Sequence, residues 1–161
     1  MNVLFVIAEA DPFIKVGGLG DVGGSLPIAL QEYAANVRVM MPKYSSIPGE
    51  YRRQMKPVTR FSVGLGWRKI PCQIEELDYR GVKYYFLDNE YYFQRDAIYG
   101  YEDEGERYAY FCKAVLESLT HINFQPQVIH CNDWHTALIP LMLQEDYGHD
   151  PYYYGIKSVL T

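Results

Sequence analysis

Two neighbouring stretches decide the fold: the apolar run Val3-Leu-Phe-Val-Ile-Ala8 and the glycine-rich stretch Asp11-Pro-Phe-Ile-Lys-Val-Gly-Gly-Leu-Gly-Asp-Val-Gly-Gly-Ser-Leu-Pro27. The first is typical of a strand that is covered on both faces, and a helical pattern, Leu26–Ala34, follows the second. Glycines let a backbone approach a ligand, and a helix N-terminus offers N–H groups and partial positive charge. Because Lys15 adds a full charge, this loop predicts an anion site. A glycine-rich connection with a solvated lysine is the alternative.

The glycine stretch also contains Gly18-Leu-Gly-Asp-Val-Gly23, which matches the G-x-G-x-x-G pattern of dinucleotide-binding loops. In that fingerprint the glycines form the turn directly after the strand, and an acidic residue for the ribose follows about 20 residues later. Here Glu9–Val16 intervenes, and the next predicted strand, Val37–Met41, leads into Pro42 and Lys43. The pattern is therefore weak support for NAD(P) binding.

The composition indicates a globular protein with a small negative charge. Hydrophobic residues make up 48% and charged residues 22% of the 161 positions, enough for one domain with a sizeable core. The formal charge of −5 argues against nucleic acid or an anionic membrane as partner. No apolar run approaches the ~20 residues of a membrane span, and the N-terminus lacks the basic region of a secretory signal. Cys72, Cys112 and Cys131 are odd in number, which favours reduced thiols and a cytoplasmic location.

Strand and helix patterns alternate along most of the chain. A first helix is expected from Gly20 or Asp21 to about Ala34, and Asp21 is either its N-cap or a ligand contact. The later segments are predicted as three antiparallel strands (Val58–Val63, Lys69–Leu77, Val82–Leu87), an irregular segment (Asp88–Gly105), two helices (Glu106–Leu119, Trp134–Gln144) and two strands (Val128–His130, Ile156–Thr161). This order predicts an α/β fold: a Rossmann-like, mostly parallel sheet with helices on both faces and an antiparallel hairpin excursion.

Ligand-type side chains are densest in His130-Cys-Asn-Asp-Trp-His135. As a metal site this turn would point its ligands in different directions, and no C-x-x-C partner exists elsewhere in the sequence. As a carbohydrate site it would lie at the carboxyl end of a strand, where open α/β sheets bind ligands. Asp133 would accept sugar hydroxyls, with Trp134 or His135 bounding the pocket. The alternatives are that Asp133 only caps a helix and that Trp134 belongs to the core.

The chain contains 16 tyrosines. A ring with a polar tip suits sugar binding, because a pyranose face stacks on the ring while the hydroxyl reaches sugar oxygens. For most of these residues packing is the simpler explanation. Tyr99, in the predicted irregular segment, is the one tyrosine that we assign to a binding site.

Several motifs resemble, in the same order, the family-five glycosyltransferases, which comprise bacterial glycogen synthases and plant starch synthases. Lys15-Val-Gly-Gly-Leu-Gly-Asp-Val22 is similar to the K-x-G-G-L signature of that family. Val37-Arg-Val-Met-Met-Pro-Lys-Tyr44 and Glu106-Arg-Tyr-Ala-Tyr-Phe111 follow, and His130-Cys-Asn-Asp-Trp-His-Thr136 resembles its H-x-x-D-W-H-T segment. The resemblance covers nearly the whole chain.

The resemblance implies the N-terminal half of a two-domain enzyme of the GT-B type. Residues 1–161 would form a single, truncated, acceptor-side Rossmann-like domain, and the second, nucleotide-sugar domain would be absent. The implied reaction transfers glucose from ADP-glucose to the non-reducing end of an α-1,4-glucan, with retention and without a cofactor or metal ion. This chain alone is expected to be inactive, because the main catalytic groups are expected beyond Thr161.

The resemblance also implies roles for individual residues. The donor would be bound by Lys15, Gly17, Gly18 and Asp21. The acceptor side of the cleft would be lined by Tyr99, Asp133, Trp134 and His135, with Asp133 as the candidate catalytic residue. Two alternatives stay open, an NAD(P)-binding domain of an oxidoreductase and a non-catalytic glucan-binding module.

Overall fold

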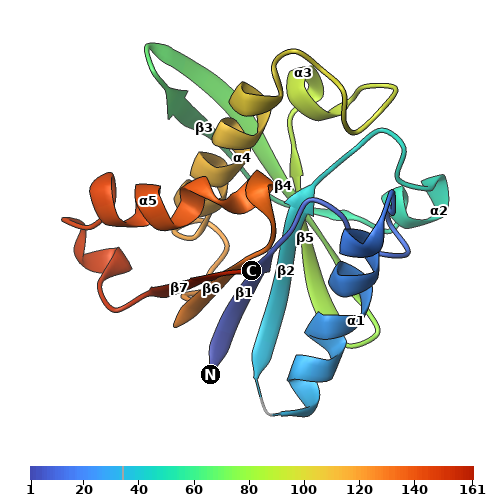
Figure 1. Cartoon of the computed structure of the whole chain (residues 1–161), viewed down its shortest axis with the longest axis horizontal. Helices are drawn as coiled ribbons and strands as arrows, with labels where there is room; N and C mark the ends of the chain where they lie inside the picture. The colour runs from blue at the N-terminus through green and yellow to red at the C-terminus, as the bar shows by residue number, and fades with distance from the viewer. Residues whose placement is uncertain (34) are drawn as a thin grey trace.

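Seven strands form a mixed sheet in the computed structural model, which describes residues 1–33 and 35–161 (Figure 1). Their order across the sheet is β3-β4-β5-β2-β1-β6-β7. The strands are β1 (Asn2–Val6), β2 (Asn36–Pro42), β3 (Lys56–Leu65), β4 (Arg68–Tyr79), β5 (Val82–Asp88), β6 (Val128–Cys131) and β7 (Lys157–Leu160). The helices are α1 (Gly18–Glu32), α2 (Gly49–Arg52), α3 (Glu90–Phe93), α4 (Glu104–Ser118) and α5 (Leu138–Glu145), with 3₁₀ turns η1 (Trp134–Thr136) and η2 (Pro151–Tyr153).

The sheet is parallel in its centre and antiparallel at one side. β1 pairs in parallel with β2 and β6, and β5 and β7 extend the parallel part. β4 pairs antiparallel with both β3 and β5. The turns that join these three strands contain Gly66 and Gly81 with φ of 59° and 78°, a conformation that glycine adopts at little cost. The predicted antiparallel excursion on a parallel sheet is confirmed.

Helices cover both faces of this sheet (Figure 1), as predicted. α1 packs on β2 and β5, whereas α4 and α5 pack together on the other side. α1 begins at Gly18, earlier than predicted, because Gly17 is its N-cap; Asp21 lies in its first turn, so the N-cap role considered for Asp21 is wrong. The predicted end near Ala34 lies outside the described residues.

Two segments differ from the sequence prediction. The predicted irregular segment Asp88–Gly105 contains α3, which begins where the Asn89 side chain accepts a hydrogen bond from the Tyr92 N–H at 3.0 Å. The predicted helix Trp134–Gln144 is divided into η1 and α5. Pro140 explains the division, because it has no N–H for the carbonyl one turn earlier and its ring crowds that turn.

The central strands are buried on both faces. Leu4, Phe5 and Val6 of β1 and Val39 and Met40 of β2 are fully buried, as expected for parallel strands between two helix layers.

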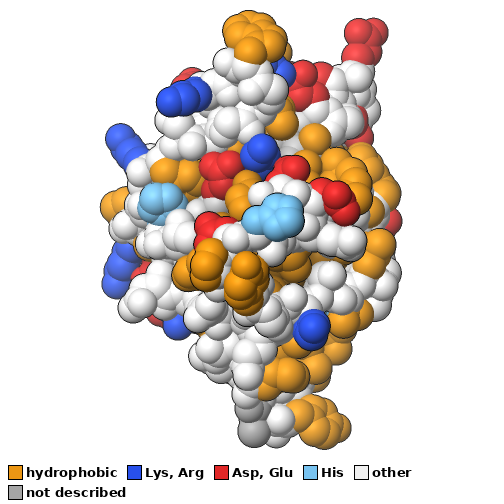
Figure 2. Space-filling model, turned by 90° about the vertical axis from the view of Figure 1, so that its left-hand side faces the viewer, with side chains coloured by type: hydrophobic (Ala, Val, Ile, Leu, Met, Phe, Trp, Pro, Cys, Tyr) orange, Lys and Arg blue, Asp and Glu red, His pale blue; other side chains and the backbone are white. Residues whose placement is uncertain are grey.

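On the α5 side, Figure 2 shows basic side chains scattered singly among acidic and apolar ones. None of the described helices is long and apolar enough to cross a membrane.

Candidate functional site

The site lies where the strand order reverses. From β1 the chain proceeds to β2 on one side, whereas β6 joins β1 on the other. The loops that leave the carboxyl ends of β1 and β6 therefore diverge, and open α/β sheets usually bind their ligands in the crevice between two such loops. The first loop carries Glu9 and Lys15, and the second carries Asp133, Trp134 and His135.

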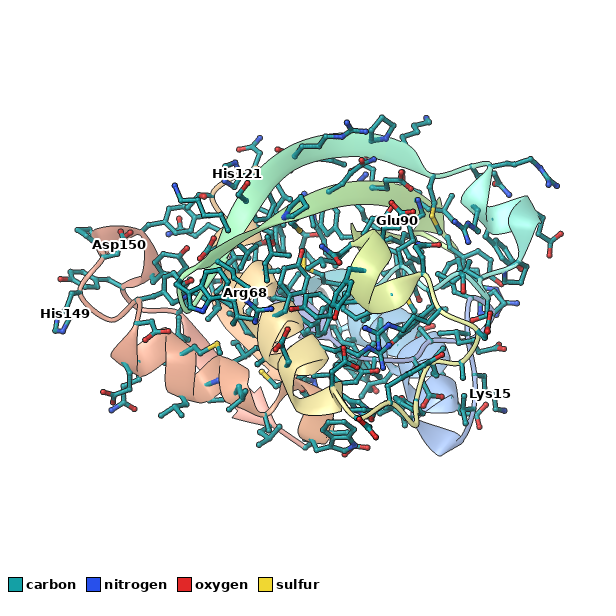
Figure 3. The ribbon with its side chains drawn as sticks, turned by 90° about the horizontal axis from the view of Figure 1, so that it is seen from above. Lys15, Arg68, Glu90, His121, His149 and Asp150 are labelled. Carbon is teal, nitrogen blue, oxygen red and sulfur yellow. The ribbon has the colours of Figure 1, made fainter. Side chains whose placement is uncertain are left out.

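Lys15 projects outward beside the start of α1 (Figure 3). Its Nζ lies 2.6 Å from Oδ1 of Asp21, and the side chains are 46% and 61% exposed. The hydrogen bond to Asp21 raises the pKa of the Lys15 ammonium. α1 has no side-chain cap at its N-terminus, so its first N–H groups add a partial positive charge next to this ion pair.

The glycines of this loop divide into two groups. A Cβ added to Gly23 would lie 2.2 Å from the Glu9 carbonyl oxygen, and one added to Gly20 would lie 2.8 Å from Cγ of Lys15. These glycines are required by the packing of α1 against the chain before it. Among the described residues, a Cβ added to Gly17 or Gly18 would meet nothing within 4 Å, and neither residue has a positive φ. The fold therefore gives no reason for glycine at 17 and 18.

Asp133 adopts a strained backbone conformation at the end of β6. Its φ is 63° and its ψ 176°, a region that non-glycine residues occupy at a cost of roughly 1–3 kcal/mol. The Asp133 N–H donates to the Thr161 carbonyl at 2.8 Å, which ties the turn to the end of β7. Its Oδ1 accepts from the Trp134 N–H at 2.6 Å. The helix-cap alternative is thus confirmed for one carboxylate oxygen, and the side chain remains exposed.

An aromatic cluster faces the Asp133 turn. The Tyr99 ring stacks on His135 with centroids 5.0 Å apart, and Tyr108 meets both Trp134 and His135 edge to face at 5.1 and 4.8 Å. Burial lowers the pKa of His135, so the ring is neutral at pH 7. Its Nδ1 is buried without a hydrogen-bond partner among the described residues. Trp134 is 51% exposed, so its assignment to the core is wrong.

Arg107 holds the segment that carries Tyr99. It is fully buried in α4, and its guanidinium donates to the carbonyls of Tyr92 at 2.8 Å and Ile98 at 3.1 Å and contacts Glu104 at 3.2 Å. Since Ile98 immediately precedes Tyr99, these bonds fix the backbone at the site. The amphipathic pattern of this helix did not predict a buried arginine.

Glu9 is the other site residue that the sequence analysis missed. Its carboxylate is buried, with the residue 3% exposed, and accepts hydrogen bonds from the Val16 N–H at 2.7 Å, the Gly17 N–H at 3.2 Å and the Tyr99 hydroxyl at 2.6 Å. Burial is the main cause that raises the pKa of Tyr99, and the hydrogen bond to Glu9 is the second. The available signal was an acidic residue placed directly after a buried strand and before the glycine loop.

These contacts connect four of the eight predicted site residues, Gly17, Tyr99, Trp134 and His135. Glu9 joins the backbone at Gly17 to Tyr99, Tyr99 stacks on His135, and Trp134 lies against His135 with ring centroids 4.0 Å apart. The other two potential ligands of this sequence cluster, His130 and Cys131, lie at the end of β6 and not in the loop after it. His130 Nε2 lies 3.0 Å from Oγ1 of Thr161, and burial raises the pKa of Cys131 to about 12. In residues 1–33 and 35–161, no group of three or more His, Cys, Asp or Glu side chains is placed to hold a metal ion.

The mostly parallel sheet, the helices on both faces and the polar loops at the strand reversal define a Rossmann-like domain with its candidate ligand site at that reversal. Comparison with known proteins specifies the family. Residues 2–161 match the model of the starch synthase catalytic domain, and the chain belongs to that family.

The relatives with known names agree with this family. The whole chain is 56% identical to a glycogen synthase of Desulfitobacterium hafniense, 52% identical to one of Anoxybacillus flavithermus and 48% identical to one of Bacillus subtilis. It covers 35%, 33% and 33% of those proteins, so the chain spans about a third of their length. The solved catalytic domain of starch synthase IV from Arabidopsis thaliana, bound to ADP and acarbose, matches 99% of this chain with a TM-score of 0.91 and 28% identity, over 33% of its own length. The fold of the chain is thus that of the corresponding part of a GT-B catalytic domain.

Proposed function

We propose that this chain is the N-terminal, acceptor-side domain of a glycogen synthase, which transfers glucose from ADP-glucose to the non-reducing end of an α-1,4-glucan with retention. Support comes from membership of the starch synthase family and from the names of its relatives. The starch synthase IV domain was bound to ADP and acarbose, which supports a donor with an ADP moiety and a glucan acceptor. The second half of the cleft would be formed by the part of the full-length polypeptide that this chain does not span.

One observation carries the donor side of the proposal: Gly17 and Gly18 face open space beside Lys15 although the fold does not require glycine there. A ligand that approaches the backbone closely would explain why glycine stands at both positions. The diphosphate would lie against these two residues and the N-terminus of α1. No metal ion is needed in this proposal, because Lys15 and the helix dipole supply the positive charge.

The Lys15–Asp21 ion pair would rearrange when the donor binds. Both side chains are about half exposed, so the pair is weak and Lys15 exchanges its partner at small cost. A phosphate is the stronger partner, because its oxygens carry more charge. Asp21 would then accept hydroxyls of the donor's sugars instead of facing the phosphates.

The aromatic cluster and Asp133 would form the acceptor side. The exposed face of Trp134 and the ring of Tyr99 suit stacking with glucose units. Asp133 is the candidate catalytic residue of this chain: its exposed carboxylate would accept hydroxyls of the reacting sugar, and its strained backbone fixes that orientation. His135, neutral at pH 7, would offer a hydrogen bond without adding charge. The groups that act on the leaving diphosphate would come from the second domain.

A binding titration on the full-length polypeptide tests the proposal. ADP-glucose and a maltooligosaccharide are expected to bind, and NAD and NADP are not. If NAD or NADP binds with micromolar affinity and ADP-glucose does not bind, the oxidoreductase alternative is supported instead. Binding of the oligosaccharide alone would support a non-catalytic glucan-binding module. Neither alternative is favoured by the comparisons.

We also propose that the enzyme works in the cytoplasm. Cys72, Cys112 and Cys131 are free and buried, and burial raises the pKa of each thiol to about 12. Such thiols are inert structural groups. The three cysteines form no disulfide, which suits a reducing compartment.

A further inference from the structure

We infer that Glu9 is a positioning residue for glucosyl transfer, because its carboxylate holds the donor loop and the acceptor-side Tyr99 in one fixed arrangement. This inference rests on the proposed function and adds to it a residue that does not itself face the substrates. Glu9 is 3% exposed, so it acts through the groups that it binds.

The hydrogen bonds of Glu9 are those of a charged acceptor. Oε2 accepts from the N–H groups of Val16 and Gly17, at 2.7 and 3.2 Å, and Oε1 accepts from the hydroxyl of Tyr99 at 2.6 Å. No cation pairs with Glu9 in the described part of the chain. A buried carboxylate without a cation is tolerated only when hydrogen-bond donors surround it. The residue therefore has a specific bonding role that an apolar side chain would not fill.

The groups joined by Glu9 come from distant parts of the sequence. Tyr99 lies 90 positions away, whereas Val16 and Gly17 belong to the loop that follows β1. The two sides of the crevice are thus tied through one carboxylate. Loss of these hydrogen bonds would leave the backbone after Lys15 without its anchor, including Gly17, the N-cap of α1. It would also free the Tyr99 hydroxyl and the ring that stacks on His135.

Glu9→Gln is the decisive substitution because it keeps the shape and removes the charge. A carboxylate accepts on both oxygens, whereas an amide has one accepting oxygen and one donating NH₂ group. If the amide oxygen faces the Val16 and Gly17 N–H groups, its NH₂ group faces the Tyr99 hydroxyl, which must then turn its proton away. The reverse orientation sets NH₂ against two N–H donors. Either arrangement disturbs one side of the crevice.

The experiment uses the full-length polypeptide that carries this chain. Glu9→Gln is expected to lower kcat/KM for glucosyl transfer by about tenfold or more, since hydrogen bonds to charged groups are the stronger ones. Backbone N–H groups in residues 15–18 are expected to exchange hydrogen for deuterium faster than in the wild type. Glu75→Gln is the matched control: Glu75 is a largely buried glutamate that contacts Lys43 at 2.7 Å and Gln73 at 2.9 Å, neither of which is a residue of the candidate site. That variant is expected to lose thermal stability with unchanged kinetics and unchanged exchange at residues 15–18.

A double-mutant cycle with Tyr99→Phe separates the effect of Glu9 through Tyr99 from its effect through the Val16 and Gly17 N–H groups. If Glu9 acts through Tyr99, the double variant loses less kcat/KM than the product of the two single losses. Tyr99→Phe also removes one bond only, so it remains informative if Glu9→Gln folds poorly. Wild-type kinetics in Glu9→Gln, or unchanged exchange at residues 15–18, would overturn the inference. If the wild-type enzyme transfers no glucose, the proposed function fails, and the exchange measurement still decides whether Glu9 holds the loop.

Discussion

The division of the loop glycines gives the sharpest test of the donor site. Gly18→Ala and Gly23→Ala add the same methyl group to α1, and the structure predicts opposite results. At Gly23 the new Cβ would lie 2.2 Å from the Glu9 carbonyl oxygen and 2.9 Å from Cα of Ala10. Both are backbone atoms, so no side chain can move to relieve the clash. At Gly18 the new Cβ would meet nothing within 4 Å.

The expected magnitudes follow from these distances. Overpacking of a tight contact costs about 1–3 kcal/mol, and 1 kcal/mol shifts Tm by roughly 2–4 °C in a domain of this size. Gly23→Ala should therefore lower Tm by roughly 2–12 °C. Gly18→Ala should leave stability unchanged or raise it by up to about 1 kcal/mol, because alanine loses less entropy in a helix. In the full-length enzyme, however, the methyl group of Gly18→Ala would fill the space proposed for the diphosphate. We expect kcat/KM for ADP-glucose to fall about ten- to a hundredfold.

Scanning calorimetry and donor-dependent kinetics on both full-length variants provide the assay. We expect a loss of activity without a loss of stability in Gly18→Ala, and a loss of stability in Gly23→Ala. Wild-type kinetics in Gly18→Ala would show that the open space beside Lys15 is not the donor site. An unchanged Tm in Gly23→Ala would show that the contact between α1 and Glu9 is looser than described.

Three further predictions concern charge, protonation and the edge of the sheet. Lys15→Ala should lower kcat/KM about ten- to a hundredfold without changing Tm, because the side chain is half exposed and its ion pair in the described part of the chain is the exposed one with Asp21; steady-state kinetics equal to those of the wild type would refute its donor role. Burial lowers the pKa of His130 and His135, so the unfolded chain binds more protons as the pH falls below about 6.5. Tm should therefore fall between about pH 7 and 5, and His135→Gln should reduce that slope; an equal slope in the variant would contradict this assignment. The 161-residue chain produced alone should show no glucosyl transfer and should self-associate through β7, where Val159 and Leu160 are 47% and 50% exposed. A radiolabelled transfer assay and light scattering measure both properties, and turnover near the full-length rate would place the catalytic groups within this chain.

The sequence by itself determined the order of the strands and of the longer helices, and the position of the two candidate ligand loops. Strands β1, β2 and β5 and helix α4 follow from local apolar periodicity, which depends on near neighbours and survives without tertiary information. The antiparallel excursion follows from short turns between strand patterns, which require a hairpin. Lys15 and Asp133 were predicted as site residues because each lies in a loop after a predicted strand, and parallel strands bring such loops to one edge of the sheet.

Only the tertiary structure decided which groups at that edge act together. The glycines at 17, 18, 20 and 23 are alike in the sequence. Only the atoms that lie next to each of them in the folded chain show which of them the fold requires. Glu9 and Arg107 were missed for the same physical reason. A buried charge is stable only when partners surround it, and the partners of Glu9 include a hydroxyl 90 positions away. Nearness in the sequence does not predict such a contact. It forms because the fold brings the segment before α4 next to the end of β1.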